Sequence, residues 1–311
     1  CGYTLGAGVL ISLMSVWAHD GRHSSMRLCR LLSRGRSFSS ASSLRADEPY
    51  DLVVVGGGIM GVWTALLAKK KYNASVLLAE QFAPAHEHGS SHGDGRIYRF
   101  AYTEDVYVDM MERSLPLWHE LQSFADEPLL AQTGGLNIAP LGSGRLDELA
   151  ELYRRRGIAH EWLSGGAANE RFPQFGLTEG AQTALYQPDF GVLFASKCVA
   201  AAWRYASSLG VDTLTPFGAA SLRREGSGGV ERVIVEDSGG GPPVTARAVV
   251  LAPGAWLSSM AEELLGLRIP THVSAETVCY YAPKEGCSID HSYRSMPVFL
   301  PGDSNGLGPF G

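Results

Sequence analysis

The chain has 311 residues, of which 45% are hydrophobic and 19% are charged, and its net charge is -6 at pH 7. This composition is typical of a soluble globular protein, large enough for one large domain or two interleaved ones. The mild acidity argues against a nucleic-acid-binding surface, so we expect no nucleic-acid partner. The five cysteines have neither metal-ligand nor redox spacing, and their odd number argues against a disulfide framework. They are Cys1, Cys29, Cys198, Cys279 and Cys287.

The first 47 residues have the composition of a leader. Residues 2–18 are apolar and barely long enough to cross a bilayer, which indicates either a membrane anchor or translated sequence upstream of the true start at Met26. Residues 26–46 contain five arginines, many serines and no acid, which is typical of a mitochondrial transit peptide; the alternative is a disordered basic tail. We therefore expect a leader over residues 1–47, a mitochondrial location and no stable membrane insertion.

A strand, a glycine turn, a helix and a second strand follow in order. Residues 52–55 are apolar and rich in β-branched side chains, which predicts a buried parallel strand. Three glycines then have the spacing G-x-G-x-x-G: Gly56, Gly58 and Gly61. Good helix formers occupy residues 59–70, and a second apolar run over residues 75–79 ends in Glu80. This order is typical of a dinucleotide-binding βαβ unit.

Each of these residue types has a physical role in such a unit. Gly56 allows the tight turn, Gly58 lets a pyrophosphate approach the backbone, and Gly61 lets the helix pack closely on the sheet. The N-terminus of the helix offers N–H groups and a partial positive charge to the phosphates. Glu80 can accept hydrogen bonds from two ribose hydroxyls. The alternative is an ordinary glycine turn in a parallel α/β protein.

Residues 84–102 predict a ligand loop. They are rich in glycine and serine and follow the second nucleotide-binding strand, where such folds place binding loops. Arg96 and Arg99 are suited to holding a carboxylate or to offsetting charge on a reduced cofactor; the alternative is a pair of solvated surface charges. The three histidines of this region match no zinc-ligand spacing, so no metal is expected. They are His86, His88 and His92.

Helices and strands are predicted along the rest of the chain. Helices are expected over residues 105–124, 145–156 and 196–209. Pro116 should kink or break the first of these, and Gly157 should end the second, whose last three arginines should form a solvated helix end. Strands are expected over residues 134–139, 211–214, 271–283 and 296–301, and a short polar turn over residues 170–175.

A hairpin over residues 230–236 and 244–248 runs directly into another buried strand, which ends in a glycine turn at Gly254. We expect this late strand to rejoin the nucleotide-binding sheet. The nucleotide-binding domain would then be discontinuous, with a second domain inserted between its parts.

Four segments together carry a resemblance to a known family. They are VVVGGGIMG at 53–61, GSSHGDGRIYR at 89–99, GVL at 191–193 and VLAPGAW at 250–256. With these the chain resembles the flavin-dependent amine oxidases of the D-amino-acid oxidase superfamily, in the branch of monomeric sarcosine oxidase and peroxisomal sarcosine/pipecolate oxidase. The second segment is the most specific of the four.

The resemblance implies an α/β fold with a Rossmann-like FAD-binding domain in two parts and an inserted α+β substrate domain. The FAD-binding parts are residues 48–100 and 186–268, and the substrate parts are residues 101–185 and 269–311. The C-terminal part is expected to be missing, because the chain begins at a cysteine and stops within what should be an unfinished sheet. We expect a piece of a longer protein or a flawed translation of a longer gene.

FAD is the implied cofactor, with its pyrophosphate over residues 56–61 and its ribose at Glu80. The residues implied to bind it are Gly56, Gly58, Ile59, Met60, Gly61, Glu80, Ser91, His92, Arg96, Ile97, Ala252, Gly254 and Trp256. The resemblance places His92, Arg96 and Arg99 at the catalytic site. Arg99 lies near the substrate carboxylate in this scheme, and Arg96 near the flavin ring favours its anionic reduced form.

The resemblance also implies a reaction. A secondary amino acid, such as sarcosine or another N-methyl or cyclic amino acid, loses a hydride from carbon to flavin N5. The imine is hydrolysed to an aldehyde and an amine, and oxygen reoxidises the flavin to give hydrogen peroxide. The implied protein is a monomer, and its animal relatives are peroxisomal, which is the alternative location.

The chain departs from the family in several places. The family's covalent flavin cysteine, its oxygen-activating lysine and a second carboxylate-binding lysine are expected beyond residue 311. A threonine common in the basic loop is replaced by Gly95.

Three alternatives stay open. The first is a mitochondrial FAD-dependent amino-acid or hydroxy-acid dehydrogenase that passes electrons to a carrier protein. The leader favours it, whereas residues 92–99 favour the oxidase. The second is an NAD-dependent dehydrogenase, which the glycine motif and Glu80 permit. The third is an inactive fragment.

Overall fold

The computed structural model describes residues 4–5, 9–11, 48–226, 231–275 and 277–301. It divides into two compact units, the first made of residues 1–93 and 195–275 and the second of residues 94–194 and 276–311. The predicted transit peptide, residues 26–46, lies outside the described residues. Within the described part of the chain, no helix has both the length and the apolar character needed to span a bilayer.

The first unit is built on a mainly parallel sheet. Its strands are β1 (Thr4–Leu5), β2 (Val9–Ile11), β3 (Tyr50–Val55), β4 (Val76–Ala79), β11 (Asp212–Leu214), β12 (Ala219–Glu225), β13 (Arg232–Asp237) and β14 (Val244–Leu251). The order along the sheet is β1-β2-β14-β3-β4-β11. β14 pairs in parallel with β3, with Leu251 opposite Val55, and pairs antiparallel with β13. The late strand therefore rejoins the nucleotide-binding sheet, as the hairpin pattern predicted.

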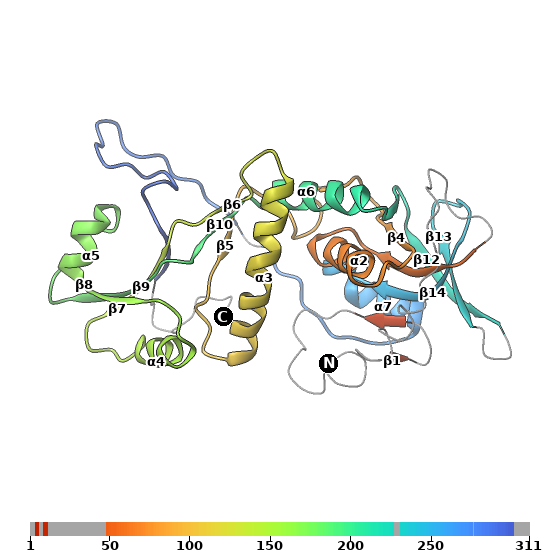
Figure 1. Cartoon of the computed structure of the whole chain (residues 1–311), viewed down its shortest axis with the longest axis horizontal. Helices are drawn as coiled ribbons and strands as arrows, with labels where there is room; N and C mark the ends of the chain where they lie inside the picture. The colour runs from red at the N-terminus through yellow and green to blue at the C-terminus, as the bar shows by residue number, and fades with distance from the viewer. Residues whose placement is uncertain (1–3, 6–8, 12–47, 227–230, 276, 302–311) are drawn as a thin grey trace. The chain divides into compact units, whose positions relative to one another are not determined.

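Helices cover both faces of this sheet (Figure 1). They are α2 (Ile59–Tyr72), α6 (Ala195–Ser208), the short 3-10 turn η2 (Gly254–Trp256) and α7 (Leu257–Leu265). α2 contacts β3, β4 and α6. On the opposite face, Val53 and Val55 share an apolar cluster with Met260 and Leu264 of α7. β3 and β4 are almost fully buried, because a parallel strand between two helical layers meets apolar neighbours on both sides.

The second unit contains two small sheets. One has the order β15-β7-β9-β8 and the other β5-β10-β6. Their strands are β5 (Arg96–Tyr98), β6 (Leu130–Ala131), β7 (Gly135–Pro140), β8 (Glu161–Ser164), β9 (Gln182–Gln187), β10 (Gly191–Leu193) and β15 (Val298–Pro301). The helices are α3 (Asp105–Phe124), α4 (Asp147–Arg156), α5 (Gly165–Arg171) and the 3-10 turn η1 (Pro173–Phe175). α5 covers one face of the larger sheet through the buried side chains of Leu136, Leu163 and Ala168.

The structure differs from the predictions at several elements of this unit. α3 is a single helix of 20 residues through Pro116, so no break occurs there, whereas a kink at Pro116 stays a prediction. Residues 170–175 hold the end of α5 and η1 instead of a plain turn. α5 is hidden in the sequence by its two glycines, and it begins where the Ser164 hydroxyl accepts a hydrogen bond from the Ala167 N–H at 3.2 Å.

The strand predicted over residues 271–283 is also wrong over the described part of that segment, which has no regular structure. Its large apolar side chains are exposed, with Val278 at 65% and Tyr281 at 90%. A strand needs a neighbouring backbone to complete its hydrogen bonds, and alternation of side chains cannot supply one. The last predicted strand does form, as β15, because β7 provides that neighbour.

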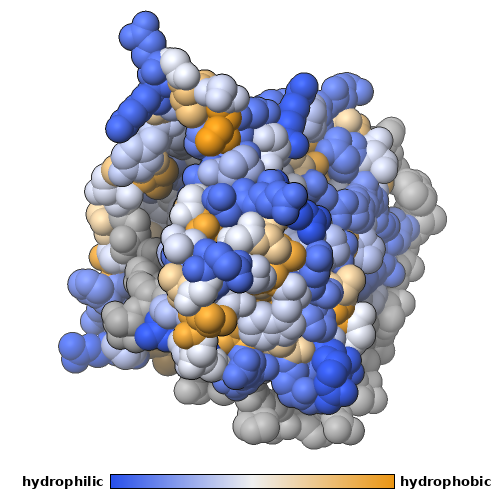
Figure 2. All heavy atoms as spheres, turned by 90° about the vertical axis from the view of Figure 1, so that its left-hand side faces the viewer, coloured by the Kyte–Doolittle hydropathy of each residue, from blue (hydrophilic) through white to orange (hydrophobic). Residues whose placement is uncertain are grey.

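Figure 2 shows a mainly hydrophilic face on which apolar residues occur in small groups. Single exposed apolar residues are ordinary on protein surfaces. In β8, for example, Leu163 is buried whereas Trp162 remains 45% exposed, as expected for a strand with one covered face.

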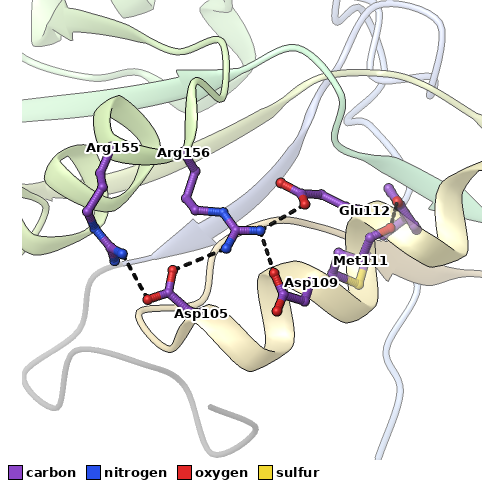
Figure 3. A network of polar contacts seen from close by, with 7 residues as sticks. Asp105, Asp109, Met111, Glu112, Arg155 and Arg156 are labelled. Atoms are coloured by element: carbon purple, nitrogen blue, oxygen red, sulfur yellow. Dashed lines mark hydrogen bonds and ion pairs between the residues drawn. The ribbon is translucent and has the colours of Figure 1, made fainter.

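The C-terminal end of α4 is bound to α3 by ion pairs (Figure 3). Nη2 of Arg156 lies 2.5 Å from Oδ1 of Asp109 and 2.8 Å from Oε2 of Glu112, and its Nη1 lies 3.4 Å from Oδ1 of Asp105. Arg155 also contacts Asp105, and the hydrogen bond from Arg155 is the main cause that lowers the pKa of that carboxyl. Only Arg154 behaves as the solvated helix end that the sequence predicted, since it is 71% exposed and pairs within its own helix with Glu151.

We predict that Arg156→Ala destabilises the protein more than Arg154→Ala does. Arg156 is 22% exposed and joins two helices, whereas Arg154 makes one exposed pair three residues away along its own helix. The fall in Tm should be roughly twice as large for Arg156→Ala, because an exposed isolated pair contributes little. Thermal unfolding at low and high salt measures this. Equal falls in Tm for the two variants would contradict the role given to Arg156.

Candidate functional site

The turn after β3 requires glycine at two of the predicted positions. Gly56 has a φ of +101°, and a Cβ there would overlap the carbonyl oxygen of Ala252. A Cβ at Gly61 would overlap the carbonyl oxygen of Gly56. The turn is thus pressed between α2 and the end of β14, which leaves no space for a side chain.

Gly57, which the motif leaves variable, is equally constrained. Its carbonyl oxygen accepts a hydrogen bond from Nε1 of Trp203 at 2.9 Å, and a Cβ on Gly57 would overlap the ring of Trp203. Trp203 is 5% exposed and comes from α6, far along the chain. Local sequence patterns hold no signal for this contact, so the prediction missed it.

The N-terminus of α2 faces this turn with its backbone N–H groups. Gly58 is the N-cap residue and has no side chain, and the first turn of the helix contains no acid. A Cβ on Gly58 would lie 3.1 Å from Oγ of Ser91, and the same oxygen accepts a hydrogen bond from the Ile59 N–H at 3.1 Å. Since the first N–H groups of a helix lack partners within the helix, those of Met60 and Gly61 suit an anionic ligand.

Glu80 is buried at the end of β4, with 5% of its surface exposed. Its Oε2 accepts a hydrogen bond from the Gly57 N–H at 2.6 Å, and its Oε1 accepts one from the Phe82 N–H at 2.9 Å. Nε2 of His86 lies 3.4 Å from the same Oε1. A carboxylate has about four acceptor positions, so these contacts orient Glu80 and leave capacity for a hydroxyl ligand.

The segment after β14 lies against the same turn. The Ala252 N–H donates to the carbonyl oxygen of Val55 at 2.8 Å. Gly254 begins the short helical turn that ends at Trp256, whose ring centroid lies 5.9 Å from that of Phe82. The structure therefore brings Ala252 to the glycine turn and Trp256 to the neighbourhood of Glu80.

The start of α6 holds the end of the predicted ligand loop. The Gly93 N–H donates to Oγ of Ser196 at 2.9 Å, and the Ser196 N–H donates to the carbonyl oxygen of Gly93 at 3.1 Å. His92 is half-buried between Ser91 and Gly93. These residues share the first unit with the glycine turn.

Arg96, Ile97 and Arg99 belong to the second unit. Arg96 is exposed and its Nη1 donates to the carbonyl oxygen of Gly95 at 2.8 Å. Ile97 is 47% exposed and lies opposite Val192 in the pair of β5 with β10. The guanidinium of Arg99 lies 5.1 Å from the centroid of the Tyr102 ring. Side chains alternate along β5, so Arg96 and Ile97 point to opposite faces of that sheet.

Buried tyrosines lie close to Arg99 in the second unit. Burial raises the pKa of Tyr98 to about 12. Burial also raises the pKa of Tyr153, and the nearby charge of Arg99 and the amide of Asn137 oppose this rise only in part. Both phenols therefore stay protonated at neutral pH.

The described residues contain no group of three or more His, Cys, Asp or Glu side chains that could hold a metal ion. The imidazoles of His86 and His88 stack on each other with centroids 5.6 Å apart. From the sequence, His86 is considered only as a possible metal ligand. Its position six residues after Glu80 is the signal that could have suggested a role beside that carboxylate.

Three features define a dinucleotide-binding protein. They are a glycine turn at the carboxyl edge of a parallel sheet, a helix N-terminus that faces this turn, and a buried acid after the second strand. The particular family follows from a family model described as "FAD dependent oxidoreductase" (DAO), which matches residues 51–308. The chain belongs to this family, and FAD is its cofactor. The glycine turn fits that cofactor, since Gly56, Gly57 and Gly58 carry no side chain that would keep a pyrophosphate from the backbone. Membership also decides against the NAD-dependent alternative.

Known relatives are sarcosine oxidases. The chain is 32% identical over 244 residues to the peroxisomal sarcosine oxidase of Mus musculus, which covers 76% of this chain and 58% of the relative. It is 31% identical over 255 residues to the monomeric sarcosine oxidase of Bacillus sp. (strain B-0618), covering 81% of this chain and 62% of the relative. The chain thus lies in the sarcosine oxidase branch, and it spans about three fifths of the length of these relatives.

A solved structure shares the fold. The open form of NikD, described as an unusual amino acid oxidase essential for nikkomycin biosynthesis, matches with a TM-score of 0.58 and 27% identity. The match covers 71% of this chain and 54% of NikD.

We predict that Gly57→Ala impairs mainly stability, whereas Gly58→Ala impairs mainly FAD binding. Gly57→Ala meets the Trp203 ring in the core and should lower the free energy of unfolding by about 1–3 kcal/mol. Gly58→Ala meets only the tip of Ser91 and should change stability by less than about 1 kcal/mol, yet weaken FAD binding because its methyl group stands where the pyrophosphate approaches. Urea unfolding without FAD and a fluorescence titration with FAD separate the two effects. Equal losses of stability would contradict the assignment.

Proposed function

We propose that this chain belongs to an oxidase that acts on the CH–NH group of a secondary amino acid, such as sarcosine or another N-methyl or cyclic amino acid. The observation that carries the proposal is the length of the match to two sarcosine oxidases. An aligned stretch of 244 residues is longer than either compact unit, so the likeness extends into both units.

The proposed cofactor contacts use the geometry of the first unit. The turn at residues 56–61 holds the pyrophosphate, with the N–H groups of Met60 and Gly61 facing it, and Glu80 accepts hydrogen bonds from the ribose. The remaining proposed contacts are Ser91, His92, Arg96, Ile97, Ala252, Gly254 and Trp256. When bound, FAD supplies a two-electron acceptor for the hydride of the substrate.

The proposed substrate contacts use the arginines. Arg99 binds the substrate carboxylate, since a guanidinium fork matches the two oxygens of a carboxylate. The ring of Tyr102 lies against the Arg99 guanidinium and limits its freedom. Arg96 supplies a positive charge beside the flavin ring, where negative charge develops as the substrate is oxidised. The resulting imine is hydrolysed to an aldehyde and an amine.

The first experiment is an absorption spectrum of the purified protein before and after anaerobic addition of sarcosine. Bleaching of flavin bands supports the amine-oxidising activity, and persistent bands reject sarcosine and direct the search to pipecolate and larger N-methyl amino acids. Admission of oxygen should then release hydrogen peroxide. Reoxidation by an artificial electron acceptor alone would instead favour the dehydrogenase alternative. Size-exclusion chromatography tests the proposed monomer.

We predict that Arg99→Ala raises KM for the amino-acid substrate by at least about tenfold, because a charge-assisted bidentate contact is lost. Arg113→Ala is the matched control, since it removes an exposed arginine of α3 in the same unit. The flavin spectrum should be unchanged in both variants. An unchanged KM in Arg99→Ala would remove Arg99 from the substrate site.

The cellular location is a separate proposal. The basic, serine-rich residues 26–46 favour mitochondrial import, whereas a relative from mouse is named a peroxisomal enzyme. Residues 1–47 fused to a fluorescent protein should reach mitochondria if the leader is a transit peptide. A diffuse signal would reject that reading of the leader and leave the peroxisome as the proposed location.

A further inference from the structure

We propose that His86 is a positioning residue for Glu80: a neutral imidazole with its proton on Nε2 that holds the carboxylate in the orientation in which it accepts the ribose hydroxyls of FAD. The inference rests on the proposed contact between Glu80 and the ribose. It assigns a task to a residue that the glycine motif does not include. Every residue in the argument lies in the first unit.

The two oxygens of Glu80 are held unequally. Oε1 accepts a hydrogen bond from the Phe82 N–H at 2.9 Å and also lies 3.4 Å from Nε2 of His86. Oε2 accepts one from the Gly57 N–H at 2.6 Å. With one contact fewer, Oε2 retains more capacity to accept hydrogen bonds from a ligand. It is also the oxygen that is hydrogen-bonded to the glycine turn. The contacts on Oε1 therefore determine which of the two carboxylate oxygens of Glu80 can accept the ribose hydroxyls.

The proton on the imidazole is assigned by its second nitrogen. Nδ1 of His86 lies 3.0 Å from the backbone N of His88, and a backbone N–H can only donate. Nδ1 must therefore accept, and a neutral ring must carry its proton on Nε2. That N–H is turned toward Oε1 of Glu80 at 3.4 Å, longer than an optimal hydrogen bond but close enough to attract a buried carboxylate.

Aromatic neighbours limit the motion of the imidazole. The ring of His86 meets Phe82 edge to face with centroids 4.7 Å apart, and it stacks on His88 at 5.6 Å. Trp256 contacts Phe82 from the segment that follows β14. The side chain of His86 is 15% exposed, so the ring has one packed position from which to meet Glu80. Packing of this kind is what a positioning residue needs.

FAD titrations of four variants test the proposal. His86→Leu removes the Nε2 donor, His86→Gln keeps an N–H donor of similar reach, Glu80→Gln removes the carboxylate, and His272→Leu is a control at an exposed histidine of the same unit. His86→Leu should raise the Kd for FAD by about tenfold, and His86→Gln by no more than about threefold. In the Glu80→Gln background, His86→Leu should have almost no further effect, because the two residues act as one pair.

The outcomes are distinct. An equal effect of His86→Leu in both backgrounds would show that His86 acts on FAD or on the fold without Glu80, and an unchanged Kd in His86→Leu would show no role; either overturns the proposal. If the unaltered protein fails to bind FAD, the proposed function itself fails, and this is seen before any variant is made.

A measurement on the unaltered protein keeps the proposal testable where a variant does not fold. Nitrogen NMR of the His86 ring at about pH 8, where an ordinary imidazole is neutral, should show a proton on Nε2 and none on Nδ1. The opposite tautomer would overturn the proposal, since Nε2 would then have no hydrogen to direct at Glu80.

Discussion

The close approach of two strand ends governs the first unit. The Ala252 N–H donates to the Val55 carbonyl at 2.8 Å, so β3 and β14 finish together at the same edge of the sheet. The carbonyl of Ala252 then occupies the space where a side chain on Gly56 would stand, and the helix that follows packs on the same turn. The proposed dinucleotide site is therefore a place without side chains, produced by the packing of segments that are distant in sequence.

Much of this arrangement could be predicted from the sequence. Strands β3 and β4, helix α2, the glycine spacing and Glu80 all follow local rules of periodicity and backbone freedom. The return of β14 was predicted from the buried strand that follows the hairpin and ends in a glycine turn. The contact of Trp203 with Gly57 could not be predicted, because tertiary packing makes it and no spacing along the chain encodes it.

The second unit shows the same limit. A run of three arginines at a helix end is usually solvated, yet two of them bind α3, because its acids Asp105, Asp109 and Glu112 lie on one side of that helix. Residues 271–283 show the converse. A strand is predicted there, but without an adjacent backbone in the described structure the large apolar side chains of the segment remain exposed. Propensity predicts what a segment can form, whereas its neighbours decide what it does form.

The position of β14 in the sheet has a consequence for synthesis. β3 and β4 are made within the first 79 residues, but the strand that covers the other edge of β3 is residues 244–251. Throughout the translation of the intervening chain, one edge of β3 presents backbone N–H and C=O groups that β14 has not yet paired. Such edges attract other chains, and contacts this distant in sequence form slowly. An open edge at β3 therefore favours association with other chains until β14 has left the ribosome.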